Sequence, residues 1–473
     1  MSVVDTDLQT APVVREGDYG TRLGTVEPGG AEVIPLAERH GRPSQLFWTW
    51  TSPNFEFATV FVGVIAVAFF RLSLAQAVLG IVVGTLLGSL TLGILSARGP
   101  AFGVPQMVLS RIAFGYRGNI LPAGLNAVTA GIGWFAVNSV SGAFALNSLT
   151  HLPRVVCLVL VVAVQSLVAV FGHNLVQAFE RWVFPVLAAA FVLAAVFVLA
   201  KAQPSSVHAG GGVGGFLLTV GASFGYAAGW NSYASDYTRY FAPDTSKKST
   251  AWWSGLGVAL SCILLEVVGA ASVTIPGAVS DNPTSAFTGH LPTVVADVTL
   301  LAIAVGAVSA NVLNIYSGSL SFAALGIRLP LRSRRALVAV VFAVLGFVVA
   351  LTGLDDAADT YNNFLLVIAY WIGPWLAVFF TDQVLRRGQD VTGLLFLTRG
   401  RNAAGWIAMA VGMAVSIPLF SNQTEFVGLV PRHHPAFGDL TFEVGFVVSA
   451  VVYAVLYGVD RRRRAGLDGP LSG

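Results

Sequence analysis

The chain is built mainly from apolar runs about twenty residues long, and this pattern limits its fold more than any other feature. A run of roughly 20 apolar residues is the length that crosses a bilayer as an α-helix. Only 11% of the residues are charged and the mean hydropathy is +0.73, whereas soluble domains carry about 25% charged residues. We therefore predict an all-α integral membrane protein.

Twelve such runs can be delimited, and we predict one transmembrane helix for each, at residues 46–70, 73–95, 120–147, 153–172, 179–200, 214–238, 251–275, 294–324, 334–353, 361–385, 403–420 and 440–459. If both ends of the chain are cytoplasmic, 23 Lys and Arg residues fall in cytoplasmic segments and four fall outside. Cytoplasmic loops carry an excess of Lys and Arg. The sequence thus predicts a multi-pass protein of the plasma membrane with both termini in the cytoplasm.

The two ends of the chain lack apolar periodicity. Residues 1–44 mix Pro, Gly and both charge signs, which predicts a cytoplasmic N-terminal tail, and residues 461–473 begin with four consecutive Arg and predict a short basic tail. We expect no cleavable signal peptide. Cys157 and Cys262 lie in separate apolar runs, so neither a disulfide nor a metal site is expected. The net charge of +3 reflects the cytoplasmic loops, and we expect membrane lipids as partners and no nucleic acid.

The first predicted helix contains residues that interrupt a helix. In "TWTSPNFEF", Pro53 removes a backbone donor and clashes with the preceding turn. Ser52 and Asn54 flank this proline, and Glu56 follows. A carboxylate beside a broken helix within a membrane span is a candidate functional group.

The sixth predicted helix has a comparable interruption in "GYAAGWNSYASDYTRYF". There, Gly225 and Gly229 are expected to break the helix just before Trp230. Interrupted helices at matching points of two halves are typical of transporters with inverted repeats, where the freed backbone groups bind substrate and ion. We predict a ten-helix core at residues 45–390, with repeats at about 45–200 and 213–386, and two additional helices at 391–460.

Polar side chains also occur within two other predicted helices. Trp134 and Asn138 lie four residues apart, hence on one helical face, and a later helix contains Asn311 and Asn314. Buried amides need hydrogen-bond partners or water, so they could join helices or line a binding site. Trp134 and Trp230 lie too deep for an aromatic belt at the membrane surface, which favours a site.

Other ionisable residues leave alternatives open. Glu266 lies in an apolar run and is either functional, protonated or paired. Asp236, three residues before Arg239, is expected to form an ion pair at the cytoplasmic end of the sixth helix.

A site of indole rings and amides suits a planar, neutral heterocycle. Indole faces stack on flat rings, and amides match the donors and acceptors along a heterocycle edge. An intramembrane enzyme would need paired acids, a Ser–His pair or a metal set at depth, so we expect no catalytic residues and no enzyme. A channel would not need two interrupted helices in matching positions. These residues therefore favour a transporter.

Several stretches resemble one family. The segment "GWNSYASDYT" at residues 229–238 is similar to a pattern of nucleobase:cation symporter family 1. The segments "SRIAFGYRGNILPAGLNAVTAGIGWFAVNS", "NVLNIYSGSLSFAALG" and "NNFLLVIAYWIGPWLAVFFTD" resemble its third, eighth and tenth helices. The similarity extends from about residue 40 to 390 and is strongest to the purine–cytosine permease group, which includes permeases for uracil, thiamine and allantoin.

The resemblance implies a LeuT-like transporter with a five-plus-five inverted repeat and two additional C-terminal helices. It implies alternating access, in which helices 1, 2, 6 and 7 move against helices 3, 4, 8 and 9. A monomer would import a purine- or cytosine-type nucleobase with a cation; uracil, allantoin, hydantoin or thiamine is the alternative substrate. By the family pattern, Trp134 and Trp230 would be the aromatic partners of the base, Asn138 and Asn314 would bond its edge, and Ser52 would lie close by.

The family pattern also bears on the coupling ion. In sodium-coupled relatives two adjacent hydroxyl residues of helix eight help to bind sodium, but here the pair reads Val308–Ser309. This departure favours H+ over Na+, with Ser309, Asn54 and Glu56 as coupling candidates and Glu56 as the candidate proton carrier. Leu313 replaces a proline of the purine–cytosine permeases, which leaves the base unspecified. No cofactor is expected.

Overall fold

A computed structural model describes residues 14–15, 19–28, 30–169, 171–207, 209–277, 282–327, 331–354, 357–398 and 403–467. All regular elements within these ranges are helices, and a helix occupies each of the twelve predicted positions. By length and composition, eight of the described helices can cross a membrane, and one bent pair makes a ninth. Apolar helices at Arg154–Ala169, Leu337–Gly353 and Ala404–Phe420 are shorter. The all-α membrane class is confirmed, while the twelve spans and the inverted repeat stay predictions.

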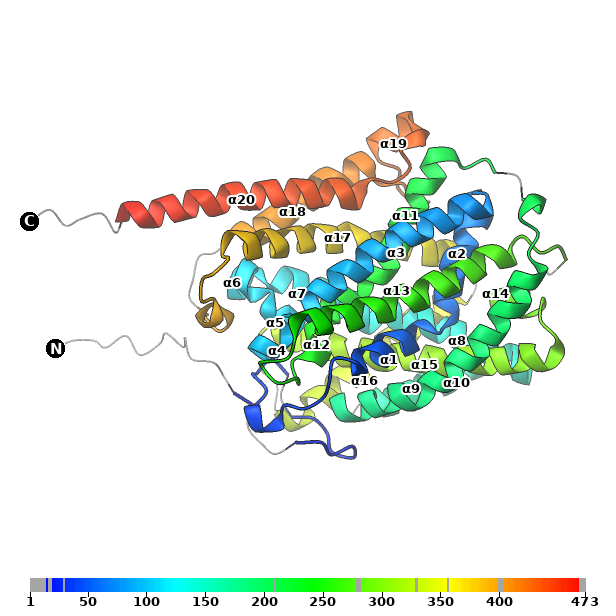
Figure 1. The fold of residues 1–473 in the computed structure, drawn as a ribbon, viewed down its shortest axis with the longest axis horizontal. Helices are drawn as coiled ribbons and strands as arrows, with labels where there is room; N and C mark the ends of the chain where they lie inside the picture. Colours follow the sequence, from blue (N-terminus) through cyan, green and yellow to red (C-terminus); the bar gives the residue numbers. More distant parts are fainter. Residues whose placement is uncertain are drawn as a thin grey trace, which may run out of the picture.

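Most of the long helices run along one axis of the molecule (Figure 1). In chain order they are α1 (Gln45–Thr51), η2 (Ser52–Asn54), α2 (Phe57–Ala68), α3 (Leu74–Ser96), α7 (Ile120–Val128), η3 (Thr129–Trp134), α8 (Phe135–Thr150), α9 (Arg154–Ala169), α10 (His173–Lys201), α11 (Gly212–Gly229), η5 (Trp230–Tyr233), α12 (Ala234–Thr238), α13 (Lys247–Ser272), α15 (Thr293–Ala324), α16 (Leu331–Gly353), α17 (Ala357–Leu385), α18 (Ala404–Phe420) and α20 (Thr441–Leu467). Short helices α4 (Gly99–Phe102), α5 (Gln106–Leu109), α6 (Arg111–Gly118), α14 (Pro283–Thr288) and α19 (Leu429–His433) lie in the connections.

The long helices pack as two groups. In the first group, α3 packs along α11 and α13, and α13 also packs along α1 and α2. In the second group, α8 packs along α9, α15 and α16. Helices α18 and α20 pack on each other and on α17, at one side of the molecule (Figure 1). The grouping agrees with the division into helices 1, 2, 6, 7 and helices 3, 4, 8, 9 that the resemblance implies.

Small residues allow close helix contacts within the first group. A Cβ atom at Gly63 of α2 would lie 1.6 Å from the backbone oxygen of Glu266 in α13, and one at Gly269 would lie 1.8 Å from the backbone oxygen of Val60. Glycine is therefore required where α2 and α13 cross. Small residues at helix contacts are typical of membrane proteins, because lipid provides little hydrophobic drive for helix association.

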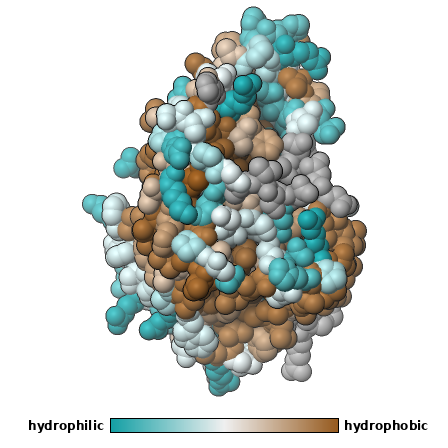
Figure 2. Space-filling model, turned by 90° about the vertical axis from the view of Figure 1, so that its right-hand side faces the viewer, coloured by the Kyte–Doolittle hydropathy of each residue, from teal (hydrophilic) through white to brown (hydrophobic). Residues whose placement is uncertain are grey.

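The flanks of the molecule expose apolar side chains at helical spacing. Leu79, Val83 and Leu90 of α3 are exposed, as are Val451 and Val455 of α20. Figure 2 views the end of the molecule opposite the C-terminal end of α20, where hydrophilic residues lie among and beside hydrophobic ones. These apolar flanks fit a surrounding of lipid.

The N-terminal segment is folded, which corrects the prediction that residues 1–44 form a tail. Residues 1–13 lie outside the described part of the chain, but the described residues between 14 and 44, here called the N-terminal strap, pack across one end of the helices. The backbone N–H of Ile34 donates to Gly103 O at 2.9 Å, and that of Glu27 donates to Phe171 O at 3.1 Å. The predicted basic tail also differs, because α20 continues to Leu467; residues 468–473 lie outside the described part.

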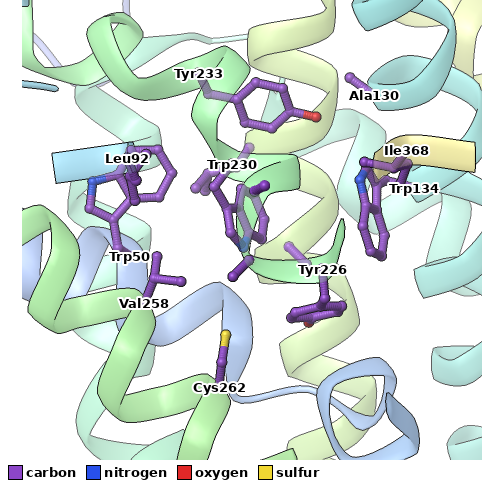
Figure 3. Packing of buried hydrophobic residues seen from close by; sticks show 14 of the residues in the cluster. Trp50, Leu92, Ala130, Trp134, Tyr226, Trp230, Tyr233, Val258, Cys262 and Ile368 are labelled. Atoms are coloured by element: carbon purple, nitrogen blue, oxygen red, sulfur yellow. The ribbon is translucent and has the colours of Figure 1, made fainter. Parts of the chain in front are cut away.

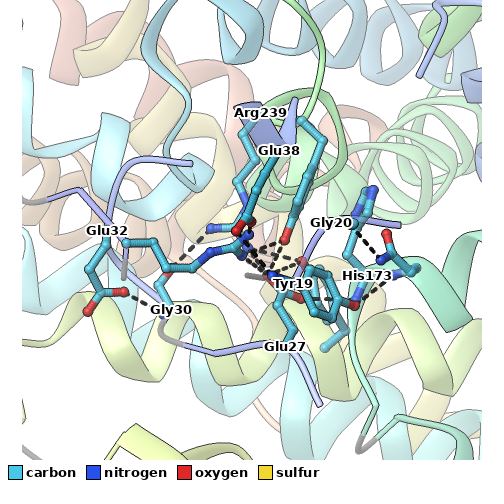
Figure 4. Close-up of polar contacts among 12 residues, drawn as sticks. Tyr19, Gly20, Glu27, Gly30, Glu32, Glu38, His173 and Arg239 are labelled. Carbon is cyan, nitrogen blue, oxygen red and sulfur yellow. Dashed lines mark hydrogen bonds and ion pairs between the residues drawn. The ribbon is translucent and has the colours of Figure 1, made fainter. Parts of the chain in front are cut away.

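A buried carboxylate anchors the strap to three helices (Figure 4). Glu27 is 2% exposed, and its Oε1 accepts hydrogen bonds from Arg239 at 2.7 Å, after α12, and from Tyr316 of α15 at 3.4 Å. Tyr240 OH donates to the same oxygen, and the backbone N–H of His173, at the start of α10, donates to Oε2 at 2.9 Å. Glu27 thus connects the end of the sixth span with the fifth and eighth spans.

This arrangement corrects the expected ion pair between Asp236 and Arg239. The guanidinium of Arg239 pairs with Glu27, and Oδ1 of Asp236 accepts from the backbone N–H of Gln106 at 2.9 Å. Sequence spacing favoured the local acid, because the strap had no apolar pattern that would have indicated folding.

Replacing Glu27 by Gln should lower the thermal unfolding midpoint of the detergent-purified protein. The buried guanidinium of Arg239 would lose its counter-charge, and breaking a buried ion pair costs about 3–5 kcal/mol. The matched control is Asp244→Asn, which removes an acidic charge from an exposed position near the same end. Equal midpoints for the two variants would contradict the role given to Glu27.

Candidate functional site

The first span is broken at the predicted place. Pro53 lies in the 3-10 turn η2, and the helix axis bends by 59° between α1 with η2 and α2. Beyond the turn, Glu56 is the N-cap of α2: its carboxylate accepts from the backbone N–H of Ala58. Its other oxygen accepts from Ser141 Oγ of α8. Both carboxylate oxygens of Glu56 are therefore occupied, and the side chain stabilises the start of α2.

Asn54 connects this break to the sixth span. Its Oδ1 accepts from Trp230 Nε1 at 2.9 Å, and its Nδ2 donates to Trp50 O at 2.6 Å. The backbone oxygen of Asn54, which the break frees, accepts from Thr59 Oγ1 at 2.6 Å. Unwound backbone inside a membrane protein needs such internal partners. Asn54 thus holds the two interrupted spans together.

The interruption of the sixth span is milder than predicted, and its glycines have another role. By length and composition, residues 212–238 form one candidate membrane span without a strong bend. The backbone of Gly229 is helical, and the irregular part is the 3-10 turn at Trp230–Tyr233. A Cβ atom at Gly225 would lie 2.4 Å from Leu365 O, and one at Gly229 would lie 3.2 Å from Nε1 of Trp134. The expectation that these glycines break the helix is corrected: they permit close contact with α17 and with an indole ring.

The two predicted tryptophans lie in one hydrophobic core, each with its own aromatic neighbours, and these rings are here called the aromatic cluster (Figure 3). The ring of Trp230 lies 5.9 Å from that of Trp50 and 5.6 Å from that of Tyr233, both edge to face. The ring of Trp134 lies 5.3 Å from that of Tyr226, also edge to face. Trp134 and Trp230 remain 8% and 7% exposed, so each ring keeps some open surface.

The two predicted amides meet through a third. Asn311 Oδ1 accepts from Asn138 Nδ2 at 3.1 Å and from Asn314 Nδ2 at 3.2 Å. Asn314 Oδ1 accepts from Tyr233 OH at 3.1 Å. Asn311 is fixed in turn by a bond from its Nδ2 to Gln165 Oε1 at 2.9 Å. Asn311 was not among the predicted site residues, although its position three residues before Asn314 on the same helix was a usable signal.

The remaining candidates, Ser52 and Ser309, meet at the first break. Their hydroxyl oxygens are 3.3 Å apart, and Ser309 Oγ also donates to Glu180 Oε2 at 2.6 Å. Glu180 was missed because the fifth span was expected to begin at residue 179. Helix α10 begins at His173, which places Glu180 about two turns inside the helix.

A cavity approaches this region from the end opposite the strap. It has a volume of about 120 Å³, and its lining includes Phe61 of α2, Ser141 of α8 and Pro283 of α14, elements that lie far from the strap in Figure 1. The lining also includes Phe364, whose ring lies 5.1 Å from that of Trp134. The cavity therefore ends beside the aromatic cluster, whereas the strap covers the other end.

Comparisons with known proteins agree with this fold. A family described as permeases for cytosine/purines, uracil, thiamine and allantoin matches residues 33–445. The putative purine-cytosine permease YxlA of Bacillus subtilis is 28% identical over 94% of this chain and 99% of its own length. The purine-cytosine permease fcyB of Emericella nidulans is 29% identical over 91% of this chain and 88% of its own.

Among solved structures, the fold is similar to that of Mhp1, a nucleobase-cation-symport-1 family transporter, in a closed conformation with bromovinylhydantoin bound. The TM-score is 0.71 at 20% sequence identity, over 90% of this chain and 94% of that structure. This likeness supports the LeuT-like architecture expected from the sequence.

The packing role of Gly225 predicts that Gly225→Ala destabilises the protein, because its Cβ would press on the backbone of α17. Gly221→Ala on the same helix is the matched control, since its Cβ would meet only Leu366 Cδ2, at 3.6 Å. We expect a lower thermal unfolding midpoint for the first variant alone. If Gly225 served to break the helix, alanine would instead stabilise it, by up to about 1 kcal/mol.

Proposed function

Because the chain belongs to the family of permeases for cytosine/purines, uracil, thiamine and allantoin, whose members are transporters and not enzymes, we propose that it is a secondary active transporter. It imports a purine- or cytosine-type nucleobase together with a cation. The protein acts as a monomer in the plasma membrane, with both termini in the cytoplasm, and needs no cofactor.

The cluster of indoles and amides at the two interrupted spans carries this proposal. Trp134 and Trp230 are 8% and 7% exposed, and the ring of Trp134 lies beside that of Phe364, which lines the cavity. Asn138 and Asn314 each donate one N–H of the amide nitrogen to Asn311, which leaves the second N–H of each amide for another partner. A flat, uncharged base satisfies both requirements, since its faces stack on aromatic rings and its edge alternates donors and acceptors.

Alternating access is supported by the difference between the two ends of the molecule. The strap covers one end, while the residues that line the cavity lie toward the other. With the termini in the cytoplasm, this conformation is closed to the cytoplasm and approached from outside. Opening to the cytoplasm requires that the bonds of Glu27 to Arg239, His173 or Tyr316 break, because these residues belong to different spans.

Proton coupling is favoured over sodium coupling by the geometry at the eighth span. A sodium site needs several oxygen ligands, but the pair Val308–Ser309 offers one hydroxyl. That hydroxyl is engaged with Glu180 and Ser52. Sodium remains the alternative coupling ion.

A different heterocycle is the alternative substrate. The family description includes uracil, thiamine and allantoin, and the similar solved structure holds a hydantoin derivative. All are compatible with stacking on an indole and hydrogen bonding to amides. Leu313, which lies next to Asn314, is the residue that separates this chain from the purine–cytosine pattern.

Uptake of radiolabelled cytosine and adenine by a permease-deficient host that expresses this chain tests the proposed function. We expect saturable uptake that increases with an inward proton gradient and falls when an uncoupler dissipates that gradient. The control is the same host with an empty vector. Absence of saturable uptake of these bases, and of uracil, allantoin, hydantoin and thiamine, would overturn the proposal.

Replacing Asn138 or Asn314 by Ala should strongly weaken this uptake. The base would lose a partner at its buried edge, which costs about 1–3 kcal/mol and corresponds to an affinity about 5- to 150-fold lower. The matched control is Asn147→Ala, in the same helix as Asn138 but bonded to Leu152 O near the end of that helix. If both site variants take up the bases as well as the unmodified protein does, these amides do not bind the base.

A further inference from the structure

Glu180 is a buried acid without a counter-charge. Its side chain has no exposed surface, and Oε1 has no hydrogen-bond partner among the described residues. No basic side chain pairs with it in the described ranges. The neighbouring Arg181 is exposed, and its guanidinium lies over the Trp48 ring. A carboxylate in such a place carries a proton or holds a cation, because an isolated buried charge is very unfavourable.

The second oxygen of Glu180 leads to the break in the first span. Oε2 accepts from Ser309 Oγ at 2.6 Å, and Ser309 Oγ lies 3.3 Å from Ser52 Oγ in η2. Two residues further along η2, Asn54 binds Trp230. A change of charge at Glu180 is therefore transmitted through one hydroxyl to the turn that holds an aromatic residue of the site.

Two other buried acids are bonded to different partners. Both oxygens of Glu56 are occupied by Ala58 N–H and Ser141 Oγ, as befits a helix cap. Glu266 accepts from Ser223 Oγ at 2.6 Å and from Thr85 Oγ1 at 3.4 Å, so it stays within the group of α3, α11 and α13.

Two further acids also have an oxygen without a partner among the described residues, Asp236 and Glu443. Asp236 is bound to the backbone of Gln106, and Glu443 lies in α20, outside both helix groups. Neither contacts the broken span. Among these acids, Glu180 is the one whose carboxylate is bonded to Ser309, whose hydroxyl oxygen lies 3.3 Å from that of Ser52 in η2.

The helices and turns that pack against α10 include α1, η2, α9, α13 and α15. Helix α1 and η2 carry no titratable side chain. The titratable side chains of the other elements include Tyr316 of α15, Cys262 and Glu266 of α13, Cys157 of α9, and His173 and Arg181 of α10 itself. Tyr316 and His173 are bonded to the strap. None of these groups supplies a fixed positive charge to Glu180.

A polar chamber lies on the strap side of Glu180. Its volume is about 300 Å³, and its lining includes His173, Gln177 and Tyr237 together with Thr21 of the strap. His173, Gln177 and Glu180 follow each other at helical spacing on one face of α10. Gln177 Nε2 has no partner among the described residues. From the end that the strap covers, the chamber therefore reaches Gln177, about one helical turn before Glu180.

We propose that Glu180 is the group that binds the coupling proton, a role that rests on the proposed function. The proton adds to the carboxylate and forms a neutral carboxylic acid bonded to Ser309. Substrate and proton then occupy the two sides of η2 at the same time. When the strap opens, the acid gives its proton to water in the chamber, and the carboxylate is restored.

Reconstituted protein in liposomes tests this assignment with two measurements on radiolabelled cytosine. Exchange of cytosine across the membrane without any gradient needs no net proton movement, whereas accumulation driven by an imposed inward proton gradient does. For Glu180→Gln, which is permanently neutral, we expect exchange to persist and proton-driven accumulation to fall at least tenfold. Acidification of a lumenal pH dye during cytosine uptake should disappear as well.

Two variants serve as comparisons. Glu443→Gln removes a membrane carboxylate outside the helix groups and should leave exchange and accumulation unchanged. Glu56→Gln tests the rival acid, and its accumulation should fall only in proportion to its exchange. Proton-driven accumulation by Glu180→Gln at the unmodified level would overturn the proposal, as would loss of coupling in Glu56→Gln alone.

If Glu180→Gln shows no exchange, a second measurement tests the role of Glu180. It measures cytosine binding to the purified protein by tryptophan fluorescence from pH 5 to 9. The affinity of the unmodified protein should vary with pH and that of the variant should not; pH-dependent binding by the variant would refute the role. Accumulation driven by a sodium gradient and not by protons would refute the identity of the ion. No transport of any tested heterocycle by the unmodified protein would instead refute the proposed function.

Discussion

The structure depends on one constraint: the polar groups freed where the first span unwinds must find partners inside the protein. Pro53 and the 3-10 turn around it release backbone groups at residues that are all buried within the protein. The hydroxyl of Thr59 donates a hydrogen bond to the backbone oxygen of Asn54, and the side-chain oxygen of Asn54 accepts one from the indole N–H of Trp230. These bonds draw the sixth span toward the break and create the aromatic and amide surface of the site.

The sequence was sufficient to predict the membrane class, the helix positions and the break at Pro53, because hydrophobic length and proline chemistry act locally. It also predicted Trp134 and Asn314 as site residues, because indole and amide groups are unusual within apolar helices, and that role stays a prediction. Glu180 was not predicted as a candidate, because the predicted start of the fifth span, residue 179, lies six residues after the start of α10 and placed Glu180 at a helix end. The role of Gly225 also escaped, since close contact with Leu365 O depends on how two distant helices cross.

The strap shows a further limit of local patterns. Its acid Glu27 contacts Arg239 and Tyr316, more than two hundred residues away in the chain. A segment rich in Pro, Gly and charged residues is predicted to be a tail, because it has little apolar surface of its own to bury. Here it folds because buried cations and hydroxyls at the helix ends need a carboxylate. Thr21 of the strap and Gln177, about one helical turn before Glu180, line one polar chamber, so the closure of this end and the proton release that we propose would involve the same region of the protein.

The central claim is that the indoles and amides at the two interrupted spans bind a planar base. A crystal structure of the protein soaked with 5-bromocytosine, with the bromine located by anomalous scattering, tests this most directly. If the base binds there, we expect one strong anomalous peak beside Trp134 and Trp230, with the edge of the base at Asn138 and Asn314. A bromine position elsewhere in the molecule, with this cluster unchanged, would contradict the binding of the base to these indoles and amides.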